Sequence, residues 1–93
     1  MFMTRASFKI AIESDTHIVL IDLDDGRSLA NDIVSVVARL KNHLQGGIGG
    51  RRIYYRDTSG RFHEITLSGG YFAAIHPCTD SQQAHLATTV DRA

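Results

Sequence analysis

This chain of 93 residues has little cysteine, no net charge and no long apolar run, and each shortage excludes a class of protein. Cys78 is its one cysteine, so no disulfide can form within the chain, and we expect a reducing, cytoplasmic location. Ten basic residues balance ten acidic ones, which removes any argument from overall charge for nucleic acid or an anionic membrane. The longest apolar run, residues 18–21, is far below the roughly 20 residues that cross a bilayer. The first residues lack the apolar segment of a signal peptide, and we expect no membrane partner.

The rest of the composition is that of an ordinary globular domain. Hydrophobic residues make up 43% of the chain and charged residues 22%, which excludes a disordered protein. A chain of this length suits one domain with one modest core. We predict a single α+β domain over residues 1–78. A polar C-terminal tail over residues 79–93 follows it, either loose or as a short helix.

One segment, residues 28–44, has the periodicity of an amphipathic helix. Ser28 is its predicted N-cap, Leu40 lies near the middle of the apolar stripe and Arg39 lies on the opposite side. Such a helix is marginal by itself in water, so we expect a β-sheet to cover the stripe. The stripe is about 100° wide and consists of Leu29, Ile33, Val36, Val37, Leu40 and Leu44.

Five further segments have the pattern of β-strands, and most are joined by short turns rich in glycine, serine and aspartate. In the first strand Phe8, Ile10 and Ile12 share one face, whereas the second is apolar on both faces, as a central strand is. The element order β-β-α-β-β-β predicts a single antiparallel sheet with one amphipathic helix packed on one face. The predicted strands are residues 7–13, 17–23, 51–56, 61–67 and 71–76.

The second face of this sheet has no predicted cover. Tyr54, Tyr55, Phe62 and Phe72 are too many to lie under one helix, so some of these aromatic side chains are expected to be exposed. An exposed aromatic face favours a homodimer or a partner protein. The alternative is that the C-terminal tail folds back over this face.

Residues 18–26 are similar to the opening motif of haloacid-dehalogenase-type phosphatases, an apolar strand followed by Asp22 and Asp24. The resemblance implies that Asp22 is a phosphoryl-accepting nucleophile and Asp24 a general acid/base beside magnesium. The later lysine and paired metal-binding acids of that family have no counterpart here, and the chain is too short for a doubly wound sheet. We therefore interpret residues 24–26 as a turn that ends the strand.

No other group of residues meets the requirements of a catalytic or metal centre. His63, His76 and Cys78 would come together if the last two strands pair, but structural zinc usually takes four ligands. No serine lies in a nucleophile-elbow motif, and no basic cluster in the sequence activates Cys78. We predict that the protein is not an enzyme and has no metal or cofactor.

The distribution of charge is uneven although the total is zero. Residues 13–32 hold six acidic residues and one arginine, whereas residues 51–61 hold four arginines and one aspartate, interleaved with aromatic residues. Arginine and aromatic side chains dominate the hot spots of protein interfaces. They also bind phosphate and stack on bases in single-stranded nucleic acid binders. The candidate interface consists of Arg52, Tyr54, Arg56, Arg61 and Phe72.

We predict a small binding or regulatory module that acts through protein–protein interaction and can form a homodimer. An adaptor, a regulator, an inhibitor or an accessory protein of a mobile element would fit this description. The alternative is a nucleic-acid-binding module that uses the arginines and aromatics of residues 51–61, with an affinity that falls steeply with salt. A third interpretation is that the arginines only pair with the acidic segment across the sheet, which stabilises the fold by less than about 1 kcal/mol per exposed pair.

Overall fold

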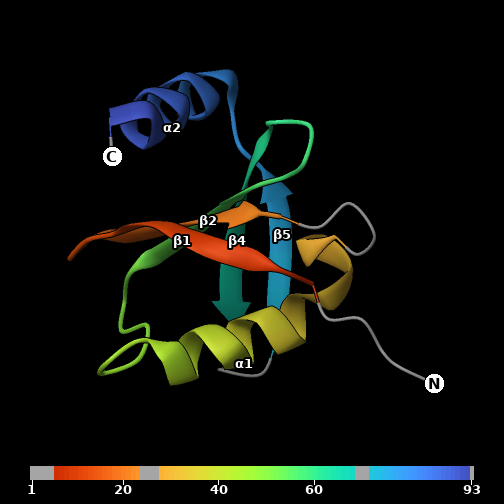
Figure 1. Ribbon diagram of the computed structural model, residues 1–93, viewed down its shortest axis with the longest axis vertical. Helices are drawn as coiled ribbons and strands as arrows, with labels where there is room; N and C mark the ends of the chain where they lie inside the picture. Colours follow the sequence, from red (N-terminus) through yellow and green to blue (C-terminus); the bar gives the residue numbers. More distant parts are fainter. Residues whose placement is uncertain (1–5, 24–27, 69–71, 93) are drawn as a thin grey trace.

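The computed structural model describes residues 6–23, 28–68 and 72–92. It shows five strands and two helices, with a short 3-10 turn before the first helix (Figure 1). The α+β class is confirmed, and no helix in these ranges is long and apolar enough to cross a membrane. The elements are β1 (Phe8–Glu13), β2 (His17–Asp22), η1 (Leu29–Asp32), α1 (Ile33–His43), β3 (Arg52–Arg56), β4 (Phe62–Ser68), β5 (Phe72–Pro77) and α2 (Asp80–Arg92).

The sheet has the order β1-β2-β3-β4-β5, and it is mixed rather than antiparallel. β2 and β3 run parallel, with Ile18 opposite Ile53 and Leu20 opposite Tyr55, while every other neighbouring pair is antiparallel. The prediction of a single antiparallel sheet is therefore wrong. The reason lies in the connection: α1 crosses the sheet face and returns the chain to the end at which β2 began, so the next strand runs in the same direction.

The helix that crosses the sheet has the predicted apolar stripe. Val36, Val37 and Leu40 are buried against Ile18, Leu20, Ile53, Tyr55 and Ile65, which confirms both the stripe and the position of Leu40. Ser28 accepts a hydrogen bond from the backbone N–H of Ala30 at 3.0 Å, so it caps the η1 turn that leads into α1.

The second helix covers the other face of the sheet, so the prediction of one helix is wrong. Figure 1 shows α1 and α2 on opposite sides of the sheet. Leu86 of α2 is buried against Val19, Tyr54 and Phe62 and belongs to a second core cluster. Of the four aromatics expected to overfill one helix, Tyr54, Tyr55 and Phe62 are all buried, so the expected exposure is wrong for them, and the side chain of Phe72 lies outside the described residues.

α2 is attached to the sheet by its own polar side chains. The N–H of Phe62 donates to Oε1 of Gln83, and Nε2 of Gln83 donates to the Phe62 carbonyl, both at 2.7 Å. The side-chain amide thus pairs with the backbone of β4 as a neighbouring strand would. Thr79 and Gln82 form a capping box, in which each side chain accepts a hydrogen bond from the backbone N–H of the other.

A β-bulge in β1 changes which face its side chains reach. The register with β2 shifts between Ile10 and Ile12. As a result Ile10 packs in the α1 cluster and Ile12 in the α2 cluster, so the prediction that Phe8, Ile10 and Ile12 share one face is wrong. The edge strand thereby supplies Phe8 and Ile10 to the α1 cluster and Ile12 to the α2 cluster.

Arg39 was expected on the solvent side of α1, but it is half-buried. Its Nη2 donates to the carbonyl of Ala6 at 2.6 Å, and its guanidinium lies over the ring of Phe8 at 5.0 Å. Nη2 also lies 4.0 Å from the Asp32 carboxylate. The long arginine side chain therefore fixes the start of β1 to α1, which periodicity alone does not reveal.

We expect the substitution Leu40→Ala to lower the free energy of unfolding by about 2–5 kcal/mol, because it opens a cavity at a fully buried site of α1. Val34→Ala is the matched control on the same helix, and it should cost less than about 0.5 kcal/mol because Val34 is 66% exposed. Urea melts measure both. Equal losses for the two variants would contradict the assignment of the buried face.

We expect Gln83→Ala to raise the hydrogen-exchange rate of the Phe62 amide by about tenfold, because that N–H loses its partner and α2 loses its attachment to β4. Thr88→Ala, at an exposed site on the same helix, should leave this rate unchanged. An unchanged rate in Gln83→Ala would show that packing of Leu86 alone holds α2.

A candidate binding cleft between α2 and the parallel strands

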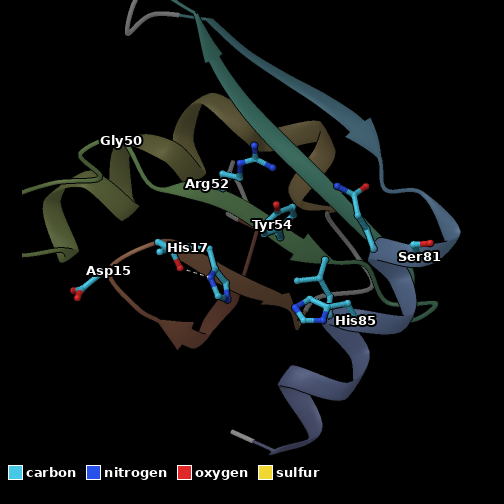
Figure 2. A pocket seen from close by; sticks show the side chains of 10 residues that line it. Asp15, His17, Gly50, Arg52, Tyr54, Ser81 and His85 are labelled. Carbon is cyan, nitrogen blue, oxygen red and sulfur yellow. Dashed lines mark hydrogen bonds between the residues drawn. The ribbon is translucent and has the colours of Figure 1, made fainter.

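A cleft of about 720 Å³ lies between α2, the β1–β2 turn and β3. Figure 2 shows His17 on the side of the turn, His85 on the side of α2, and Arg52 and Tyr54 projecting from β3. Both strands that contribute to it belong to the parallel pair, so the crossover through α1 sets their spacing. The lining residues are Asp15, Thr16, His17, Gly50, Arg52, Tyr54, Ser81, Gln82, His85 and Leu86.

The turn side of the cleft is held by a hydrogen-bond network around Ser14. Its Oγ accepts from the backbone N–H groups of Thr16 and His17 and donates to the carbonyl of His17. Thr16 Oγ1 also lies 2.9 Å from Nδ1 of His17, in a hydrogen bond whose direction depends on the tautomer of the ring.

The floor of the cleft contains Arg52 and Tyr54, two of the residues predicted for the interface. Arg52 is exposed, and its guanidinium forms no ion pair with a described residue. A side-chain hydrogen bond with Tyr54, followed by the charges of Tyr54 and Glu64, raises the pKa of Arg52. Tyr54 is only 8% exposed, and its ring lies edge-on to His17 with 6.4 Å between the centroids.

The neighbouring arginine, Arg51, has a different role. Its guanidinium donates to the carbonyls of Gly47, Ile48 and Ser14, and it pairs with Glu13 at 3.3 Å. Arg51 therefore fixes the glycine loop after α1 to the β1–β2 hairpin. Of two consecutive arginines, one is used inside the fold and the other is left available to a ligand.

The α2 side of the cleft was not predicted as a site. Ser81, His85 and Leu86 come from the segment that the sequence analysis assigned to a polar tail. The capping box at Thr79 and Gln82 was the signal that could have located the start of this helix. No pattern in the sequence indicates which sheet face the helix covers.

The other predicted interface residues lie outside the cleft. Arg56 shares the face of Arg52 and Tyr54 by strand alternation, but it is half-buried and does not line the cleft. Arg61 is exposed in the β3–β4 connection. The side chain of Phe72 lies outside the described residues.

A second polar group lies on the α1 face, at the end of β3. The ring of His63 stacks on Tyr55 with centroids 4.7 Å apart, and its Nε2 lies 2.8 Å from Oδ2 of Asp57. Burial, followed by the charges of Asp57 and Asp22, raises the pKa of Tyr55 to about 12. Tyr55, His63 and Asp57 thus contact one another at the turn after β3, and we assign them a structural role.

Asp57 is an ionised carboxylate held by its own turn. Burial alone would raise its pKa, but hydrogen bonds from Ser59, from His63 and from the backbone N–H groups of Arg61 and Ser59 outweigh that effect and lower it to about 2. The same bonds close the turn between β3 and β4.

The residues considered for phosphatase or metal chemistry are not assembled in the described structure. Asp22 is buried, and its carboxylate accepts a hydrogen bond from the backbone N–H of Leu29, while Asp24 lies outside the described residues. His76 lies opposite Glu64 in the sheet, and Glu64 follows His63 on β4. Because consecutive residues of a strand point to opposite faces, His63 lies on the α1 face and His76 on the other. Within the described ranges no group of three histidine, cysteine or acidic residues could hold a metal ion. Burial raises the pKa of the Cys78 thiol, and Glu64 adds to this.

The chain matches no protein-family model, no curated protein and no solved structure in the comparisons that we made. The site must therefore be interpreted from its own geometry.

We expect Asp57→Asn to lower the stability at neutral pH and to lose this effect in acid. The pKa of Asp57 in the folded chain, about 2, lies below the ordinary value of 3.8, so its stabilising contribution is complete above about pH 4 and disappears as the pH falls through about 2. The difference should stay below about 1 kcal/mol, since the side chain is 28% exposed and water screens it. Urea melts across this pH range should show the two proteins converging, and a constant difference would contradict the lowered pKa.

Proposed function

We propose that this chain is a non-enzymatic binding module that holds a segment of a partner protein in the cleft between α2 and β3. The observation that carries the proposal is Arg52, an exposed cation at the floor of the cleft that forms no ion pair with a described residue. Arginine in a partly enclosed site beside tyrosine is typical of the anchors of protein interfaces.

Two features of the cleft support binding rather than catalysis. Ser81 and His85 lie one turn apart on α2, but no hydrogen bond joins a nucleophile to a base at this pair in the described structure. The contact between Thr16 and His17 has no described carboxylate on the other ring nitrogen to orient the base.

Nucleic acid is the second candidate, and two observations make it weaker than a protein partner. Arg51 is used within the fold, which interrupts the row of cations from residue 51 to residue 61. Tyr54 and Tyr55 are buried, so neither presents an open ring face on which a base could stack.

Selection of a random-peptide phage library on the immobilised chain tests the proposal. We expect the selected peptides to bind the wild type and Arg56→Glu alike. They should bind Arg52→Glu at least about tenfold more weakly, a loss on the scale of an interface hot spot. Arg56→Glu is the matched control, because it makes the same charge change on the same strand and face outside the cleft.

Two outcomes would contradict the proposal: no enriched peptide, or peptides that bind all three proteins equally. Sedimentation measurements over a range of concentrations identify one special case. If the wild type dimerises and Arg52→Glu does not, the partner is a second copy of this chain.

A further inference from the structure

We propose that the partner segment is acidic. Its carboxylate binds Arg52 between His17 and His85, and protonation of the two histidines strengthens the binding. This inference rests on the proposed function and adds the chemistry of the ligand and its dependence on pH.

The first step is the supply of hydrogen-bond donors in the cleft. The guanidinium of Arg52 has five N–H groups. One side-chain hydrogen bond joins Arg52 to Tyr54, which leaves further N–H groups for a ligand. A planar carboxylate is the protein group that best matches such donors, since it accepts two parallel hydrogen bonds from one arginine.

The second step is the balance of charge around these donors. Arg52 is the permanent cation among the lining residues, and Asp15 is the acidic one. Glu64, on the strand beside β3, also acts on Arg52. At neutral pH the cleft is therefore close to neutral, and a stronger attraction for an acidic segment requires additional positive charge.

The third step is the pair of histidines that can supply this charge. Histidine is the side chain whose charge normally changes between about pH 5 and pH 8. His17 faces Asp15 on its own turn and Arg52 and Tyr54 on β3. His85 also lines a neighbouring hollow that contains Arg92, so no described acidic residue shares that hollow with it. Protonation of both rings adds two positive charges to the lining of the cleft, one from the turn and one from α2.

The sign of the pH effect follows from linkage. An anionic ligand favours the protonated form of a nearby histidine, so its affinity rises as the pH falls through the range in which the histidines become charged. Carboxylates of the ligand stay ionised above about pH 5, which places the strongest binding at about pH 5–6.

The cleft also limits the rest of the ligand. Leu86 and the edge of the Tyr54 ring give it an apolar part beside the guanidinium. A segment in which acidic and apolar side chains alternate satisfies both parts, because an extended chain directs alternate side chains to opposite sides.

The experiment measures fluorescence polarisation of a labelled peptide in which Glu alternates with Leu, and of a matched peptide with Gln in place of Glu. At about pH 6 we expect the Glu peptide to bind at least about tenfold more tightly than the Gln peptide, and its affinity should fall at least about fivefold by pH 8. Arg52→Glu should remove the preference for Glu, and Arg56→Glu should keep it.

The double variant His17→Gln/His85→Gln tests the pH dependence. It should bind the Glu peptide with the same affinity at both pH values, whereas the control His43→Gln, on the exposed end of α1, should behave as the wild type does. Circular dichroism confirms that each variant is folded. A double variant that keeps the wild-type pH dependence would overturn the role of the histidines.

Failure of this inference can be distinguished from failure of the proposed function. If library peptides bind through Arg52 but the Glu and Gln peptides bind equally, the acidic ligand is wrong and the binding module stands. If labelled oligothymidylate binds more tightly than the Glu peptide and loses affinity steeply with salt, the ligand is a nucleic acid and this inference is overturned. If neither the library nor either peptide binds, both proposals fail.

Discussion

The structure depends on the need to cover both faces of β2. Ile18, Val19 and Leu20 are consecutive and fully buried, so they point alternately to the two faces and neither face can be left open to water. Ile18 and Leu20 contribute to the cluster under α1, and Val19 contributes to the one under α2. Burial of an aliphatic side chain stabilises the fold by about 1.5–3 kcal/mol. A strand of this kind therefore requires two helices, one on each face.

This constraint explains which parts of the fold could be predicted from the sequence. The apolar stripe of α1, with Leu40 near its middle, depends on local periodicity and was predicted correctly. The parallel pairing of β2 and β3 is a property of the crossing connection, which periodicity does not encode. The bulge in β1 was missed for a similar reason. It shifts the hydrogen-bonding register of β1 with β2 between Ile10 and Ile12, and the alternation of apolar residues in β1 is compatible with a regular strand as well as with a bulged one.

In the candidate site, some residues could be predicted from the sequence and others could not. Arg52 and Tyr54 were selected for the interface because arginine and tyrosine are enriched at interfaces, but residue type does not explain why Arg52 and not Arg51 reaches the cleft. That distinction arises from the glycine loop, whose carbonyls at Gly47 and Ile48 accept from Arg51 and not from its neighbour. The α2 side of the cleft was unpredicted because Ser81 and His85 lie on a helix with a weak apolar face, and such a helix takes its position from tertiary contacts.

The cleft itself is a consequence of how α2 is attached. The clamp of Gln83 on the Phe62 backbone holds the helix over β4, and Leu86 packs onto the apolar part of the sheet at Val19 and Tyr54. The start of β3, where Arg52 lies, is opposite His17 at the turn end of β2 and contributes no residue to that apolar cluster. A helix attached at β4 thus leaves Arg52 uncovered and at the same time provides the second wall of its cleft. The contact that completes the second core is therefore also the one that creates the proposed binding site.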